Sequence, residues 1–335
     1  MKRVLWLALA AAVALAQTAP TARQIAGRLT ANDLKADVSF LASDALEGRA
    51  TPSRGLDIAA EYIAAQFRRA GLEPAGDDGY FQTAAIESFE PHKLRNVVGV
   101  LRGSDPVLKD TCLVISAHYD HLGMRAEGED RIYNGADDDA SGVATVIEAA
   151  AALAALPVRP KRSIVFLALF GEEVGRIGSR YYVQHPVFPA AKTIADVNLE
   201  QLGRTDDDEG PRVGQFNLTG FDYTTMAPVF RQAAEDAGVR AVKDEKNSDA
   251  YFSRSDNAMF AETGIPSTTV SVAYMFPDYH AVGDEWPKLD YDNMAKVDSA
   301  IALAAFRLAD SAETPRWNSG NPKTARYIEV RRAPR

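Results

Sequence analysis

The sequence holds a single cysteine, Cys112, among its 335 residues, so no disulfide can form within the chain. A protein of this length without disulfides must hold itself together through its hydrophobic core, helped by bound metal where metal is present. Cys112 lies in an apolar run, and we interpret it as a buried thiol of that core.

Basic residues are also in short supply. The chain has 37 lysines and arginines against 46 aspartates and glutamates, which gives a net charge of −9. Nucleic-acid binding depends on clustered lysine and arginine, so this balance argues against a nucleic acid as a partner. The same excess of acid suits a site that collects cations.

Long hydrophobic runs are missing except at the start of the chain. Lys2 and Arg3 precede an apolar run over residues 4–15, and residues 14–16 form a small-x-small cleavage motif. This pattern is typical of a secretory signal peptide over residues 1–16, and a membrane anchor would need a longer run. We therefore expect export to the periplasm or the medium, with no membrane span and a net charge near −11 after cleavage.

Beyond the leader, apolar residues recur first with helical spacing and then in short runs. Residues 22–70 follow a helical pattern that a polar loop interrupts. Apolar runs then alternate with helical stretches, which predicts one α/β domain over residues 22–312 with a mixed, mostly parallel sheet and helices on both faces. The predicted strands cover residues 96–103, 111–118, 163–170, 194–200 and 267–272, and the predicted helices cover 140–156, 176–184, 221–237 and 293–308. Residues 313–335 are rich in proline, arginine and asparagine, and we interpret them as an extended, loosely packed tail.

Histidine and acidic residues gather where the predicted strands end, which is where open α/β sheets build their sites. Any one of them could be a helix cap or a structural histidine, but the same bias recurs in four loops. The residues concerned are His118, Asp120, Asp137, Asp138, Asp139, Glu172, Glu173, Glu200 and His280.

Histidines and carboxylates in one site suit hydrolytic zinc. Zinc takes imidazole nitrogen and carboxylate oxygen, and two ions about 3.5–4 Å apart can share the activation of one water. His118 and Asp120 stand two apart on a strand and point to the same face, so Asp120 can fix the orientation of the His118 ring. A glutamate pair gives one side chain to a metal and leaves its neighbour free as a base.

Six segments resemble, in order, the successive motifs of metallopeptidase family twenty-eight. That family contains leucyl-type aminopeptidases, glutamate carboxypeptidases and glutaminyl cyclases. The resemblance covers about residues 34–308, and six ordered motifs are far more specific than one. The segments are SAHYDHLG (116–123), NGADDDASGVA (134–144), FGEEVGRIGS (170–179), VNLEQLGR (197–204), SDNAMFAETGIPS (255–267) and PDYHAVGDEW (277–286).

The resemblance implies a set of five metal ligands. His118 and Glu200 would bind one zinc ion, and Glu173 and His280 would bind a second. Asp138 would bridge the two ions, because the bridging aspartate of the family stands three residues before a serine. The family often has a cis peptide bond after this aspartate, here between Asp138 and Asp139.

The resemblance also implies the catalytic residues and the activity. Glu172 would be the general base, and Asp120 would support His118. The implied activity is the removal of amino-terminal residues from peptides. A carboxypeptidase or glutaminyl cyclase on the same scaffold stays open as an alternative, as does a non-catalytic binding protein of the same fold.

The chain departs from the family pattern at two positions. Glu200 stands where well-known members have aspartate, and Asn257 stands where relatives often have histidine, a change that we expect to affect the pocket more than the metals. We interpret His121 as a supporting or structural residue, and His92 and His185 as surface residues. A serine nucleophile within residues 253–255 is disfavoured, because no Gly-x-Ser-x-Gly elbow surrounds it.

Overall fold

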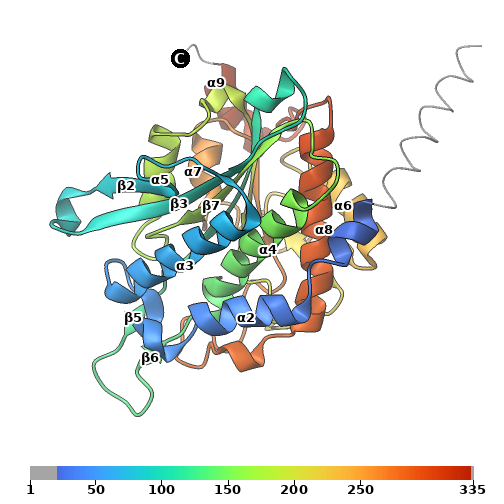
Figure 1. Cartoon of the computed structure of the whole chain (residues 1–335). Coiled ribbons are helices and arrows are strands. Elements are labelled where there is room, and N and C mark those ends of the chain that lie inside the picture. Colours follow the sequence, from blue (N-terminus) through green and yellow to red (C-terminus); the bar gives the residue numbers. More distant parts are fainter. Residues whose placement is uncertain (1–20, 333–335) are drawn as a thin grey trace, which may run out of the picture.

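The protein folds as one sheet between two layers of helices (Figure 1). The structure is a computed structural model that describes residues 21–332, so the predicted signal peptide lies outside the described residues and stays a prediction. The helices are α2 (Ala31–Leu41), α3 (Arg54–Ala70), α4 (Gly142–Ala154), α5 (Ile177–Gln184), α6 (Ala227–Ala237), α7 (Asn257–Glu262), α8 (Tyr291–Asp310) and α9 (Ala325–Arg332).

Nine strands form the main sheet, in the order β1-β3-β7-β4-β8-β13-β11-β12 with β2 paired to β3. The central strands β7, β4, β8 and β13 run parallel, and antiparallel pairs flank them on both sides. The predicted fold class is therefore confirmed. The strands are β1 (Glu73–Pro74), β2 (Phe81–Ala85), β3 (Lys93–Leu101), β4 (Cys112–His118), β7 (Ser163–Leu169), β8 (Thr193–Leu199), β11 (Gln215–Leu218), β12 (Arg240–Val242) and β13 (Ser267–Ser271), besides two small ribbons, β5–β6 (Gly123–Met124, Ile132–Tyr133) and β9–β10 (Asp206–Asp207, Gly210–Pro211).

The core lies on both faces of the sheet, which explains why β4 reads as a continuous apolar run. Successive side chains of a strand point to opposite faces. Leu113 and Ile115 pack into the larger core under α2, α3, α4 and α8, whereas Cys112 and Val114 pack into the core under α5 and α7. Cys112 is a free, buried thiol, as the sequence predicts.

The carboxy-terminal segment is packed, so the prediction of a loosely packed tail is wrong for residues 313–332. Trp317 and Tyr327 are buried and stack on one another with ring centroids 4.7 Å apart. Both rings contact Phe252, and the Trp317 indole donates a hydrogen bond of 2.9 Å to the carbonyl of Gly264. Most residues of this segment are polar, but Trp317 and Tyr327 bury enough apolar surface to order it.

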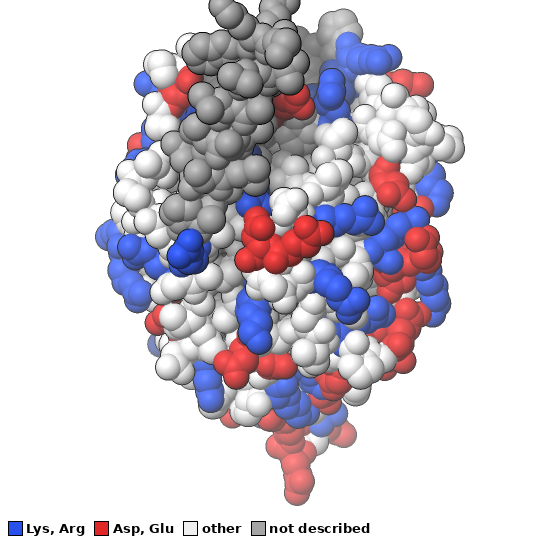
Figure 2. Space-filling model, turned by 90° about the vertical axis from the view of Figure 1, so that its right-hand side faces the viewer, with Lys and Arg blue, Asp and Glu red and all other residues white. Residues whose placement is uncertain are grey.

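Basic and acidic side chains are interspersed on the face of the molecule shown in Figure 2. That face is the right-hand side of Figure 1, along α6 and α8, and its coloured part carries no broad area of a single sign. Among residues 21–332, no helix is both long enough and apolar enough to cross a membrane.

Three acidic side chains lie buried between helices far from the strand ends. Asp37 on α2, Glu148 on α4 and Asp298 on α8 face one another where these helices pack. Burial raises the pKa of Asp37 to about 6, although the Tyr62 hydroxyl donates a 2.7 Å hydrogen bond to this carboxyl. Burial and the charge of Asp37 raise the pKa of Glu148 to about 7. The folded protein therefore holds these protons more tightly than the unfolded chain does.

We expect Asp37→Asn to stabilise the protein by about 1–3 kcal/mol at pH 8, since each pKa unit corresponds to about 1.4 kcal/mol. In the native protein, the free energy of unfolding falls as the pH rises from the unfolded pKa near 4 through the folded pKa, because the unfolded chain releases the proton first. Asparagine cannot ionise and still accepts the Tyr62 hydrogen bond, so the gain should fall to about half at pH 5, which lies between the unfolded and folded pKa values. Urea denaturation at both pH values measures it.

Glu235→Gln is the matched control, because Glu235 is exposed on α6. It should leave the free energy of unfolding nearly unchanged at both pH values. A gain for Asp37→Asn that is equal at pH 5 and pH 8 would contradict the assigned cause.

Candidate metal centre

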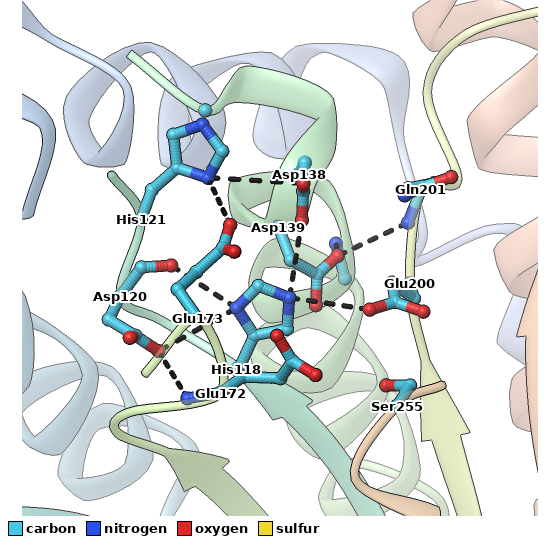
Figure 3. Close-up of polar contacts among 12 residues, drawn as sticks. His118, Asp120, His121, Asp138, Asp139, Glu172, Glu173, Glu200, Gln201 and Ser255 are labelled. Carbon is cyan, nitrogen blue, oxygen red and sulfur yellow. Dashed lines mark hydrogen bonds and ion pairs between the residues drawn. The ribbon is translucent and has the colours of Figure 1, made fainter. Parts of the chain in front are cut away.

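Neighbouring strand ends bring the predicted site residues together, as Figure 3 shows. His118 is the last residue of β4, Glu172 and Glu173 follow β7, and Glu200 follows β8. Because these three strands run parallel and side by side, their ends share one edge of the sheet. Asp138 reaches the same point from the loop before α4, and His280 reaches it from the loop after β13.

Asp138 stands between two groups of donors. Its Oδ1 lies 3.2 Å from His118 Nε2, which is also 3.4 Å from Glu200 Oε1. Its Oδ2 lies 3.1 Å from His280 Nε2, which is 3.4 Å from Glu173 Oε1. The other four predicted ligands therefore surround the Asp138 carboxylate, although the binding of metal by these five residues stays a prediction.

The neighbours of Asp138 explain why the middle residue of the aspartate triplet faces the centre. Asp137 accepts hydrogen bonds from the backbone N–H groups of Gly203 (2.6 Å) and Arg204 (3.1 Å), while Asp139 accepts one from Gly142 (3.0 Å). Asp284 accepts hydrogen bonds from the backbone N–H groups of Asp137 and Asp138. The peptide bond between Asp138 and Asp139 is cis, as the family resemblance implies.

Glu172 and Asp120 lie next to the first group. The side chain of Glu172 belongs to neither group around Asp138, and burial together with nearby carboxylates raises its pKa well above the usual range. Asp120 Oδ1 lies 3.7 Å from His118 Nδ1 and accepts a 3.1 Å hydrogen bond from the backbone N–H of Glu172. Asp120 thus ties the loop that carries Glu172 to the strand that ends at His118.

The donor set fits zinc. Three of the atoms that face one another are buried without a hydrogen-bond partner among the described residues: His118 Nε2, His121 Nδ1 and Glu173 Oε1. Burying unpaired nitrogen and carboxylate oxygen is costly unless something else occupies their lone pairs. Imidazole nitrogen and carboxylate oxygen are the ligands that zinc takes in hydrolytic sites, so a zinc ion in each group would satisfy these atoms.

Arg49 supports the centre, and the sequence argument missed it. Its guanidinium is fully buried and donates to the carbonyls of Tyr119 (2.9 Å), Asn134 (2.7 Å), Gly135 (2.9 Å) and Leu41. Tyr119 lies between His118 and Asp120, and Gly135 precedes the aspartate triplet, so one side chain joins the two loops. This role of Arg49 depends on contacts between residues far apart in the sequence, so no local motif indicates it.

The remaining histidines, Asn257 and Ser255 can also be compared with their sequence interpretation. His121 is buried with Nδ1 2.8 Å from Glu173 Oε1, whereas His92 and His185 are exposed. Asn257 bonds the Phe252 carbonyl and the Thr269 hydroxyl, a structural role that the sequence argument did not assign. The hydroxyl of Ser255 accepts a 2.8 Å hydrogen bond from Asn198.

A small cavity of about 50 Å³ opens onto the centre. Its walls combine acidic ligands with tyrosines, hydroxyl groups and one arginine. The lining residues are Asp138, Glu172, Glu200, Gln201, Thr219, Tyr251, Arg254, Ser271, Tyr274, Tyr279 and His280. A cavity of this composition suits a small polar group held beside the metal ligands.

Comparison with known families and sequences points to metallopeptidases. The profile of the family described as "Peptidase family M28" matches residues 96–305. Two similar curated proteins are each named a probable zinc metalloprotease. The one from Pyricularia oryzae is 36% identical over 153 residues, which cover 44% of this chain and 30% of the relative. The one from Leptosphaeria maculans is 27% identical over 257 residues, which cover 75% of this chain and 58% of the relative. The chain thus spans less than two thirds of the length of either.

Solved structures share the fold. The LapA aminopeptidase of Legionella pneumophila has a TM-score of 0.70 at 20% identity, over 87% of this chain and 74% of LapA. A zinc aminopeptidase from Bacillus subtilis has a TM-score of 0.66 at 16% identity, over 85% of this chain and 97% of that enzyme. At such identities the likeness concerns the fold alone.

Proposed function

Because the chain belongs to peptidase family M28, we propose that it is an aminopeptidase that uses two zinc ions to remove the first residue of a peptide. The observation that carries the proposal is the position of Asp138, whose two oxygens face two separate sets of donors. One carboxylate between two donor sets suits two ions that share a bridge. His118 and Glu200 would hold one ion, and Glu173 and His280 the other.

The residues beside the metals divide the work of hydrolysis. Bound zinc polarises a carbonyl group and lowers the pKa of a water that it holds. Glu172 lines the cavity, so its carboxylate takes a proton from the attacking water and delivers it to the leaving amine. Its raised pKa makes it a stronger base than a free glutamate. Asp120 holds the His118 ring through its backbone carbonyl, 3.2 Å from His118 Nδ1, and the Glu172 backbone through its carboxylate.

A panel of chromogenic substrates tests the proposal. We expect hydrolysis of aminoacyl anilides that carry a free amine, and at least about 100-fold slower hydrolysis of the same compounds after amine acetylation, since a tenfold rate change needs only about 1.4 kcal/mol. Preference for acetylated peptides with a free carboxylate would replace the aminopeptidase by a carboxypeptidase. Release of ammonia from glutaminyl peptides without cleavage would indicate a cyclase. No turnover by the zinc-loaded chain would leave a binding protein.

One observation favours the carboxypeptidase as the second candidate. Arg254 lines the cavity, its guanidinium lies over the Tyr251 ring at 4.7 Å from the centroid, and no acidic side chain bonds to it among the described residues. A guanidinium in this position can bind a carboxylate with two hydrogen bonds. Arg254→Gln should therefore slow hydrolysis of substrates with a free carboxylate and spare the anilides.

We also propose that the chain acts outside the cytoplasm. The basic start, the short apolar run and the small-x-small motif before residue 17 support this location. Sequencing the amino terminus of the protein recovered from a native culture tests it, with cleavage after Ala16 as the expected result and an intact Met1 as the contrary one.

A further inference from the structure

His121 occupies a position that the five-ligand set does not explain. It follows Asp120, is fully buried, and points its Nδ1 at the second donor group (Figure 3). Nδ1 lies 2.8 Å from Glu173 Oε1 and 3.9 Å from Asp138 Oδ2. The ring packs against Gly135, where the Cβ of any other residue would lie 2.5 Å from the His121 Cγ. The fold therefore holds this imidazole in one place.

The contact between His121 and Glu173 is not a hydrogen bond. Nδ1 and Oε1 are close enough for one, yet both atoms lack a hydrogen-bond partner among the described residues because their directions do not align. His118 Nε2 shows the same pattern with its own carboxylates, at 3.2 Å and 3.4 Å and likewise without a hydrogen bond. Donor atoms that lie this close together without a hydrogen bond between them can bind one cation in common. A cation bound in this way satisfies both lone pairs.

We propose that His121 binds the second zinc ion directly, through Nδ1, together with Glu173 and Asp138. The proposal rests on the two-metal site proposed above and adds a ligand that the family resemblance does not imply. His121, Asp138 and Glu173 offer one donor atom each within 4.8 Å of one another. His121 and Asp138 are buried and the Glu173 side chain is 8% exposed, so these three residues form a nearly complete set by themselves.

His280 then becomes the outer ligand of that ion. Its side chain is 37% exposed, and its backbone has a φ of 53°, in the left-handed region that few residues other than glycine adopt. Its ring meets the His121 ring edge-on, with centroids 5.8 Å apart. An exposed ligand on a loop can leave the ion and return, whereas His121 is fixed by the packing of Gly135.

Metal titration of variants separates the two histidines. His280→Ala should keep two zinc ions per chain, with a weaker second site. His121→Gln should weaken that site by more than the roughly 10–100-fold that removal of a supporting residue causes. The double variant should bind one ion. His185→Gln, at an exposed histidine, is the matched control and should bind two. Equal affinity of His121→Gln and the native chain would overturn the proposal.

Nuclear magnetic resonance of the native chain gives a test that needs no variant to fold. The sequence has five histidines, so the imidazole nitrogens of a 15N-histidine-labelled chain can be counted. After loading with 113Cd, we expect one-bond coupling to cadmium at three histidines, with exposed His92 and His185 uncoupled. Coupling at only two histidines would refute the role of His121, even in a chain that binds two ions and hydrolyses peptides. Loss of peptidase activity with three coupled histidines would instead refute the proposed function alone.

Discussion

Replacing Glu172 with glutamine is expected to lower kcat by about 10³-fold, in the middle of the roughly 10²–10⁴-fold range typical of general acid–base catalysis. The side chain lines the cavity but belongs to neither donor group, so glutamine keeps the shape and loses only the ability to take a proton. Zinc content should stay at the value of the native chain. Steady-state kinetics with an aminoacyl anilide and elemental analysis of the same sample measure both quantities.

The neighbouring Glu173 provides the matched control for this variant. Glu173→Gln alters an oxygen 3.4 Å from His280 Nε2, so it should lower metal affinity first and activity as a consequence. Excess zinc should restore part of the activity of Glu173→Gln and none of that of Glu172→Gln. Near-normal turnover by Glu172→Gln would show that another residue acts as the base.

Replacing Arg49 with methionine is expected to cost at least about 4 kcal/mol of folding free energy, because four buried carbonyls lose their donor at about 1–3 kcal/mol each. Such a loss approaches the whole stability of a typical domain, about 5–15 kcal/mol. The loops that carry His118 and Asp138 would also lose their common anchor. Chemical denaturation of the zinc-free protein measures the first effect, and zinc titration measures the second.

Arg54→Met is the control for a general effect of losing an arginine, since Arg54 is exposed at the start of α3. It should change stability by less than about 0.5 kcal/mol, as surface substitutions usually do. Arg49→Lys should fall between the two, because an ammonium reaches fewer of the carbonyls than a guanidinium. If the free energy of unfolding of Arg49→Met lies within about 1 kcal/mol of the native value, the hydrogen bonds of Arg49 are not important for stability.

The strands that carry the site could be predicted because each is buried on both faces. β4, β7 and β8 therefore appear in the sequence as mostly apolar runs, with a histidine at the end of β4 and a glutamate soon after β7 and β8. β11 and β12 were missed because they are short and form the last two strands at one side of the sheet, where no long apolar run is required. The order of the strands likewise depends on pairings that no local pattern records.

The ligands could be named from motifs, but their surroundings could not. His121 stands three residues from His118, yet its relation to Glu173 arises only when β4 and β7 pair. Arg49 lies 70 residues from Tyr119 and 86 from Gly135 in the chain, so nothing near it in the sequence announces the contacts. The tail misled for the opposite reason, because Trp317 and Tyr327 are isolated aromatics among polar residues. The average composition of a segment does not show that two of its residues are buried.

The packed carboxy-terminal segment has a consequence for the order in which the protein is completed. Phe252, against which Trp317 and Tyr327 rest, belongs to the same short stretch as Tyr251 and Arg254, two residues of the cavity wall. Its packing partners follow all five predicted ligands in the sequence, so they leave the ribosome after them. A chain released early, at residue 312, would contain all five predicted ligands and would still lack the support behind Phe252.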